Sequence, residues 1–297
     1  MEHPYDDLAT TLHTKNAHDR DARIRFVEEG HRYFIDGREG YTSTTTVVHD
    51  WFEPFDASAV ISKMMSSARW SKSKYYGMSA DDIKKQWSDK GTEAATLGTL
   101  LHERIEYFYN DWPWLQVRTE ADVEKTRVEF DQFTRFNELI VKDKGYVPYR
   151  TEWCVFDNDH RISGSVDMLY QVSADDPDTL MIYDWKRTAK LKKTNAFQCG
   201  KAPLEHLPDC NYWHYALQLN IYCHILETFY GKKIAGMVLV AMHPERDRFE
   251  HQPVPRLTHE VAAVLEQRRA ALRAEDTAAA ATTVNETTPG QAIAVAE

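Results

Sequence analysis

The spacing of apolar residues changes along the chain, from mainly helical in the first half to strand-like in the middle. Residues 24–27 and 33–35 flank the turn EEGH, a pattern typical of a short β-hairpin. Asp56 and Ser79 are typical helix caps, ahead of VISKMM and IKKQW. Two further helices are predicted over residues 99–109 and 121–141.

The second half of the chain predicts a sheet with helices on its faces. Residues 152–156, 162–172 and 179–185 are rich in β-branched and aromatic side chains and are separated by turn residues, which indicates an antiparallel meander. Residues 211–230 are apolar on more than one face and predict a buried helix, followed by the strand IAGMVLVAM. The predicted fold class is α/β, with a central mixed β-sheet that contains the meander.

These elements divide the chain into four predicted regions. Residues 1–22 are polar and predict a flexible N-terminus, and residues 23–97 form a hairpin and helical region. Residues 98–273 contain the sheet and form the core. Residues 274–297 are low in large apolar residues and predict a disordered tail.

Composition narrows the class of protein. No apolar run reaches the roughly 18 residues that a membrane helix needs, and MEHPYDDLAT lacks the features of a secretory signal. We therefore expect an intracellular protein with no membrane partner, in the cytoplasm of a host or bacterium, or in a nucleus or nucleoid. The spacing of the four cysteines fits neither paired metal ligands nor a compact disulfide framework.

A net charge of −10 argues against a protein that coats nucleic acid, so any contact with DNA must be local. Two stretches combine the basic and aromatic residues that grip phosphates and stack on bases. Taken alone, either stretch is more typical of a solvated surface. The first contains Arg69, Trp70, Lys72, Lys74 and Tyr75, and the second contains Lys186, Arg187, Lys190, Lys192 and Lys193.

The candidate chemistry lies on the predicted meander. If the turn SADDPD joins its strands symmetrically, Val172 faces Thr179, and equal steps outward place Asp167 opposite Asp184. Two facing carboxylates repel each other, by roughly 3 kcal/mol at about 5 Å and an effective dielectric of about 20, so a cation is expected between them. Lys186 leaves the same strand face as Asp184. The alternative is an ordinary surface hairpin, but IYD is too apolar for a wholly solvated strand.

These residues carry a family resemblance. GSVDMLY followed by MIYDWKRT resembles the D…(D/E)-x-K signature of the PD-(D/E)XK nuclease superfamily, with a restriction-endonuclease-like core. GTLLHERIE and ALQLNIY resemble the G-x-x-x-H and Q-x-x-x-Y elements of its RecB-like exonuclease branch. The resemblance covers about residues 98–222. HRYFIDG and YTSTTTVVHDWF resemble viral and phage members of that branch.

The resemblance implies a metal-dependent DNA exonuclease, active in DNA recombination, repair or replication, that uses Mg²⁺ or Mn²⁺. Lys186 would assist the attacking water, and Gln218 with Tyr222 would position the phosphate. Relatives often carry a further acid where this chain has Glu152. The implied metal ligands are His102, Asp167, Asp184 and the Trp185 carbonyl.

Two departures from the family and two alternative functions accompany this interpretation. The cysteines do not fit the set that holds an iron–sulfur cluster in some relatives, so no cluster is expected. The chain lacks a GxxxxGK[ST] phosphate loop, so the protein is expected to act on DNA alone or with a single-strand-binding or recombination partner protein. A structure-selective endonuclease would use the same metal site, and a non-catalytic nucleic-acid-binding protein could keep the fold.

Overall fold

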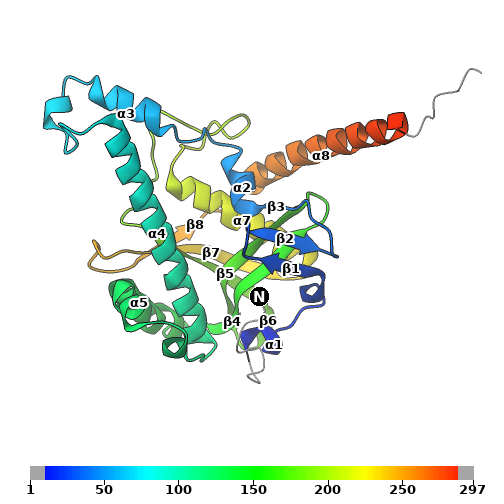
Figure 1. Cartoon of the computed structure of the whole chain (residues 1–297). Helices are drawn as coiled ribbons and strands as arrows, with labels where there is room; N and C mark the ends of the chain where they lie inside the picture. Colours follow the sequence, from blue (N-terminus) through cyan, green and yellow to red (C-terminus); the bar gives the residue numbers. More distant parts are fainter. Residues whose placement is uncertain (1–10, 287–297) are drawn as a thin grey trace, which may run out of the picture.

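A six-stranded mixed sheet lies at the centre of the protein, with helices on both of its faces (Figure 1). The computed structural model describes residues 11–286. The predicted hairpin is confirmed as a separate two-stranded antiparallel sheet. Its strands are β1 (Ile24–Val27) and β2 (Arg32–Ile35), and the central sheet contains β3 (Thr42–Ser43), β4 (Val147–Asp157), β5 (Ile162–Ser173), β6 (Asp176–Arg187), β7 (Lys233–Met242) and β8 (Glu250–Val254).

Strand β5 organises the sheet. It pairs with β4 in antiparallel fashion along most of its length, and on its other edge it pairs first with β3 and then with β6. The meander β4–β5–β6 is therefore confirmed, and β7 adds to it in parallel. Residues 164–167 of β5 lie between the segments that pair with β3 and with β6, so the sheet opens at this point.

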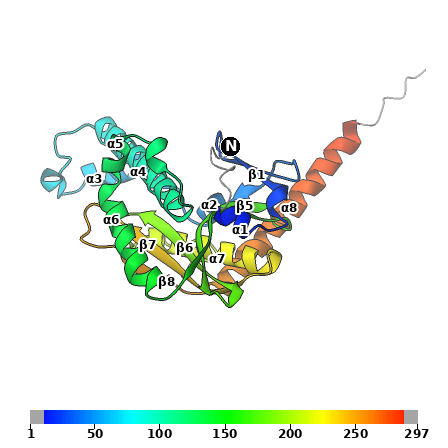
Figure 2. The ribbon, with the colours of Figure 1, turned by 90° about the horizontal axis from the view of Figure 1, so that it is seen from below.

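The two faces of the sheet are covered by different helices (Figure 2). On one face, α7 packs with α2 and the start of α8 over Leu169 and Ile182. On the other face, α4 and α6 pack over Met168 and Tyr183. The helices are α1 (Leu12–Lys15), α2 (Thr44–His49), α3 (Ala57–Met65), α4 (Ala80–Tyr109), α5 (Glu120–Lys125), α6 (Arg127–Phe136), α7 (Asn211–Phe229) and α8 (Thr258–Glu286).

Helix α4 is one continuous helix, whereas the sequence predicted two. Ser79 caps it as predicted, because the Ser79 side chain accepts the backbone N–H of Asp82 at 3.1 Å. Gly91 and Gly98 do not interrupt it; both lie among good helix formers, and nothing lies within 4 Å of a Cβ built at either position. The predicted boundary between residues 97 and 98 therefore falls inside α4, whose first half extends away from the sheet (Figure 1).

The predicted helix over residues 121–141 is interrupted in the structure. It comprises α5, then α6, then a π-helical stretch over Asn137–Lys142. Thr126 separates α5 from α6, and its hydroxyl accepts a hydrogen bond from Arg104 of α4 at 3.0 Å. The helix that the apolar spacing predicted is thus broken at Thr126, where the side chain makes a tertiary contact with α4.

Within the described residues, both ends that the sequence predicted to be flexible contain tertiary contacts or regular structure. Asp21 joins the N-terminal segment to β4, because it pairs with Arg150 at 2.8 Å and accepts the indole N–H of Trp153 at 2.7 Å. Polar contacts thus hold a segment that has little apolar surface. Helix α8 continues to Glu286, since alanine favours helix without needing a core to pack against. The rest of the predicted tail, 287–297, lies outside the described residues.

Three further structural features expected from the sequence are present. Asp56 caps α3 by accepting the backbone N–H of Ala59 at 2.9 Å. The predicted buried helix is α7, and the strand after it is β7. Within residues 11–286, no helix has the combination of length and apolar character needed to span a membrane.

Candidate active site

The register of β5 and β6 brings Asp167 and Asp184 together. Met168 pairs with Tyr183 and Leu169 with Ile182, so Asp167 and Asp184 follow as the next facing positions. The turn itself is not symmetrical, because Ser173 faces Asp176 and a bulge lies between Gln171 and Ser173. Pro177 has no N–H for the ladder, and the bulge absorbs it. The predicted register at the site therefore holds despite a different turn.

Lys186 lies on the same strand face as Asp184, as its spacing predicted. Its Nζ is 2.7 Å from Asp184 Oδ2, and the Lys186 and Asp184 side chains are only 17% and 3% exposed. The ammonium also lies 4.8 Å from the centre of the Tyr215 ring on α7. Sequence reasoning missed Tyr215, although its spacing from Gln218 and Tyr222 puts all three residues on one face of the helix.

His102 reaches the strand carboxylates from the second half of α4. Its Nε2 lies 2.9 Å from the Trp185 carbonyl oxygen, and its Nδ1 lies 3.4 Å from Glu152 Oε1 and 3.6 Å from Asp167 Oδ2. Asp167 Oδ2 also accepts the backbone N–H of Trp185 at 2.8 Å. Residues from α4, β4, β5 and β6 thus meet around one point.

Glu152 occupies this position through an unusual backbone conformation. Its φ is +42°, in the left-handed region that residues other than glycine rarely adopt, and it lies within strand β4. The Ser165 hydroxyl donates a hydrogen bond to Glu152 Oε2 at 2.9 Å. Backbone strain of this kind costs on the order of 1–3 kcal/mol and concentrates at functional sites. The chain thus adopts a strained backbone conformation at the residue that brings this carboxylate beside His102.

The site carries more negative charge than its own cations balance. Burial raises the pKa of the Asp167 carboxyl, and Asp184 raises it further, to about 7. Burial also raises the pKa of Asp184, against the opposing effect of Lys186. Burial lowers the pKa of His102, but Asp167 and Glu152 outweigh that effect and raise it to about 9. Three carboxylates thus share one ammonium and one imidazole.

This donor set fits a divalent cation. Ligand atoms of His102, Glu152 and Asp167 all lie within 4.8 Å of one another. Carboxylate oxygens suit Mg²⁺ and Mn²⁺, and the imidazole nitrogen makes the set more favourable for Mn²⁺. A cavity of about 570 Å³ opens beside His102 and Glu152, and Phe26 and Tyr33 of the hairpin also line it.

Gln218 and Tyr222 lie next to this group on α7. The Gln218 amide donates to the Tyr222 hydroxyl and to Thr45 Oγ1, both at 3.3 Å. Burial raises the pKa of Tyr222 well above its usual value, so the hydroxyl keeps its proton. A Cβ added at Gly164 would lie 2.7 Å from the Tyr222 hydroxyl oxygen, so only glycine allows this approach of α7 to β5.

We expect Gly164→Ala to lower both stability and activity. The added methyl group must displace the Tyr222 ring, and overpacking of this kind costs about 1–3 kcal/mol. Thermal unfolding and cleavage assays of the purified variant measure the two effects. Gly98→Ala is the control, because nothing lies within 4 Å of a Cβ at that helical position. Equal melting temperatures for the two variants would contradict the proposed close approach.

The basic and aromatic residues predicted to bind DNA are distributed over two surfaces. Arg69, Lys72 and Lys74 are exposed between α3 and α4, beside the half-buried Trp70 and Tyr75. The Tyr75 hydroxyl accepts the indole N–H of Trp87 at 2.8 Å. Ala80, at the start of α4, is separated from His102 by 22 residues, or about 33 Å of helix. This first surface is therefore remote from the carboxylates.

The second basic surface follows β6. Lys190 and Lys192 are exposed, and Lys193 donates a hydrogen bond to Gln252 Oε1 at 2.7 Å. Arg187 differs from them, because its guanidinium is 11% exposed and pairs at 2.6 Å with the buried carboxylate of Glu129. Arg187 thus binds the protein core at α6, and three lysines remain near the site.

Comparisons with known proteins give one family match and weak likenesses to solved structures. A family model described as the PD-(D/E)XK nuclease superfamily matches residues 66–286. No curated protein matches the chain. Among solved structures, a "Putative exonuclease" from Eubacterium rectale is 12% identical, with a TM-score of 0.35, over 78% of this chain and 79% of that chain. The protein SSO0001 is 16% identical, with a TM-score of 0.24, over 58% of this chain and 72% of that chain.

Proposed function

Because this chain belongs to the PD-(D/E)XK nuclease superfamily, we propose that it is a Mg²⁺- or Mn²⁺-dependent DNA exonuclease. Its substrate as a nuclease is nucleic acid. The observation that carries the proposal is the meeting of Asp167, Asp184 and Lys186 with His102 and Glu152 around one point. A cellular role in DNA recombination, repair or replication, with or without a single-strand-binding or recombination partner, is part of the same proposal.

His102, Glu152, Asp167, Asp184 and the Trp185 carbonyl would hold the cation. A bound divalent ion supplies Lewis-acid stabilisation of phosphate charge and lowers the pKa of water. Lys186 carries a fixed positive charge, since Asp184 and Asp167 outweigh the effect of burial and raise its pKa. Its ammonium orients the attacking water and stabilises charge on the phosphate. Glu152 was expected only as an additional acid, and its contact with His102 supports a role as a ligand.

The α7 side of the site is suited to holding a phosphate. Tyr222 keeps its proton and Gln218 has an amide, so both offer hydrogen-bond donors without adding negative charge. Such donors would position the reacting phosphate against the carboxylates. Positioning of this kind raises the reaction rate strongly, although the donors take no part in bond making or breaking. Tyr215 contributes by packing against the Lys186 ammonium.

An exonuclease mode is favoured because two helices flank the carboxylates. His102 of α4 contacts Trp185 of β6, and Tyr215 of α7 contacts the neighbouring Lys186. A DNA strand that reaches these residues would pass between the two helices. Such a passage favours a free end. The surface around Arg69 and Trp70, at the far end of α4, would then hold DNA that has not yet entered.

We expect the protein to remove nucleotides from linear DNA and to leave covalently closed circles intact under the same Mg²⁺ conditions. The measurement follows labelled linear, nicked and closed circular DNA over time. Asp184→Asn controls for contaminating nucleases. Rapid linearisation of relaxed closed circles by the wild-type chain, absent in Asp184→Asn, would replace the exonuclease proposal with a structure-selective endonuclease.

His102→Ala is expected to weaken metal binding more than it destabilises the fold. The variant loses a nitrogen ligand, so it needs a higher metal concentration for half-maximal cleavage and loses any preference for Mn²⁺ over Mg²⁺. Metal titrations of cleavage measure both effects, and thermal unfolding in chelator measures the fold. An unchanged metal titration together with a lower melting temperature would make His102 a structural residue.

A further inference from the structure

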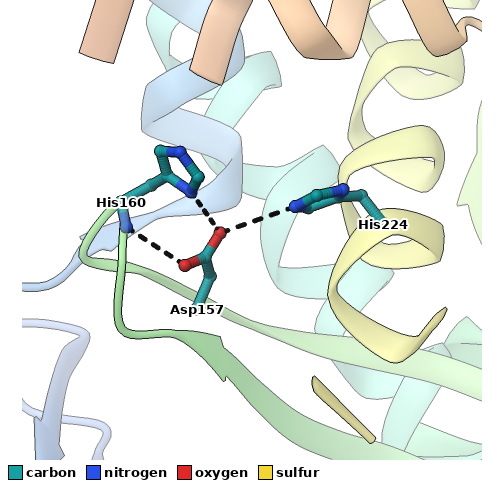
Figure 3. A group of neighbouring side chains, drawn as sticks. All are labelled: Asp157, His160 and His224. Atoms are coloured by element: carbon teal, nitrogen blue, oxygen red, sulfur yellow. Dashed lines mark hydrogen bonds and ion pairs between the residues drawn. The ribbon is translucent and has the colours of Figure 1, made fainter. Parts of the chain in front are cut away.

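A second cluster of nitrogen and oxygen side chains lies where the turn between β4 and β5 meets α7 (Figure 3). Asp157 ends β4, His160 lies in the turn and His224 lies on α7. Both imidazole rings point toward the Asp157 carboxylate (Figure 3). Ligand atoms of the three residues all lie within 4.8 Å of one another. Five residues of β4 separate Asp157 from Glu152, a distance of about 17 Å, so this cluster is distinct from the nuclease site.

The carboxylate of Asp157 is fully buried and oriented by its own turn. Its Oδ1 accepts the backbone N–H groups of Asp159 at 2.8 Å and His160 at 3.1 Å. Its Oδ2 lies 2.6 Å from His160 Nδ1 and 3.8 Å from His224 Nε2. The His224 Nε2 atom is buried, and it has no hydrogen-bond partner in the described part of the chain. A buried polar atom without a partner is costly, and this one faces a carboxylate at a distance too long for a hydrogen bond.

We propose that Asp157, His160 and His224 form a binding site for a divalent transition-metal ion, with zinc as the best fit. Two imidazole nitrogens and one carboxylate oxygen form a known zinc ligand set, in which a fourth position stays open. The same nitrogen donors disfavour Mg²⁺ and Ca²⁺, which prefer oxygen ligands.

The distances within the cluster suit such an ion. Ligands bound at about 2.0–2.1 Å to a tetrahedral ion lie about 3.3 Å from one another. The two separations from Asp157 Oδ2, 2.6 Å and 3.8 Å, fall on either side of that value, so small side-chain rotations suffice. Burial lowers the pKa of His224, which favours the neutral imidazole that binds metal.

Arg269 of α8 competes with the ion. Its guanidinium Nη2 donates to His160 Nε2 at 3.0 Å, so the neutral His160 ring carries its proton on Nδ1 and donates it to Asp157. An ion at Nδ1 displaces that proton, and the ring then carries its proton on Nε2, facing the Arg269 donor. Metal binding therefore releases Arg269, whereas the adjacent Arg268 keeps its bond to the His160 carbonyl oxygen.

A bound ion would fix α7 to the sheet. His224 follows Tyr222 by two residues on the same helix, and the turn that holds Asp157 and His160 joins the two strands that carry Glu152 and Asp167. An ion held by groups from both elements stabilises the folded chain over the unfolded chain, in which His224 is far from Asp157 and His160. The inference rests on this cluster alone and does not depend on the nuclease assignment.

The test measures the melting temperature of the full chain with and without Zn²⁺, in excess Mg²⁺. Zn²⁺ is expected to raise the melting temperature of the wild type and of His102→Ala, which lacks the histidine of the nuclease site. It should have a smaller effect on His224→Ala, whose nuclease site is intact, and none on the double variant His102→Ala/His224→Ala. The matched control is His214→Ala. His214 is also a histidine of α7 that pairs with an aspartate, Asp209, at 2.8 Å, and its variant should keep the zinc effect.

Two further measurements keep the inference testable if His224→Ala fails to fold. Crystals of the wild type grown with Zn²⁺ should show an anomalous scattering peak between Asp157, His160 and His224. Arg269→Ala should bind Zn²⁺ more tightly than the wild type in equilibrium dialysis, because it removes the competing donor. No peak among the three residues, or an equal zinc-induced rise in His224→Ala, would overturn the proposed site.

Discussion

Asp167→Asn is expected to reduce cleavage by at least about a thousandfold while leaving the metal-free fold as stable as the wild type or more stable. The lost carboxylate is both a proposed metal ligand and the acceptor of the Trp185 N–H. Asparagine keeps an oxygen for that N–H but binds a cation poorly. Cleavage rates at saturating Mg²⁺ and thermal unfolding in chelator measure the two effects.

The stability effect has a predicted pH dependence. The folded-state pKa of Asp167 is about 7, above its ordinary value of 3.8, so its protonated form stabilises the fold at acid pH. That contribution is lost as the pH rises through about 7. Asparagine does not ionise, so the melting temperature of Asp167→Asn in chelator should exceed that of the wild type most clearly above pH 7. The difference should vanish toward pH 4.

Asp184→Asn should lose cleavage activity to a similar extent, but its metal-free fold should gain less stability than that of Asp167→Asn. Asp184 is the partner of the Lys186 ammonium, so its replacement leaves that buried cation with fewer compensating charges. Asp178→Asn is the matched control, because Asp178 is also an aspartate of β6 paired with a lysine, Lys232, at 2.6 Å. Normal cleavage by either Asp167→Asn or Asp184→Asn would remove the metal-site proposal.

The parts of the site that local rules specify were predictable from the sequence. Strand residues alternate between faces, so counting from the turn gave the register of Asp167 and Asp184 and placed Lys186 beside Asp184. Helical spacing placed Gln218 and Tyr222 together, and the pair is bonded at 3.3 Å. These results depend only on periodicity, which the amino-acid sequence displays directly.

The parts that depend on packing between distant elements were not predictable in this way. The contact of Glu152 with His102 needs a left-handed residue within a strand, which no propensity rule anticipates. The ion pair of Arg187 with the buried Glu129 removed a cation from the expected DNA surface, and it joins β6 to α6. The Asp157–His160–His224 cluster joins a turn to His224, which lies far from that turn in the sequence. Each of these features arises from the tertiary arrangement of the chain.

Lys186→Ala is expected to bind DNA and metal but to cleave about a hundredfold to a thousandfold more slowly than the wild type, because the proposed ligands remain while a charge aimed at the phosphate is lost. Its metal-free melting temperature should fall, since Asp184 and Asp167 then face each other without the ammonium. Added Mg²⁺ should restore much of that loss, because a bound cation replaces the missing positive charge.

Lys232→Ala is a closely matched control for this variant. Lys232 is also a largely buried lysine of the fold, paired at 2.6 Å with an aspartate of β6 and 5.2 Å from the centre of a tyrosine ring. Its loss should lower stability without changing the rate of cleavage per bound complex. Single-turnover rates and binding isotherms for both variants separate catalysis from affinity. If Lys186→Ala instead loses affinity for DNA while its single-turnover rate stays normal, Lys186 holds the substrate phosphate and takes no part in the chemical step.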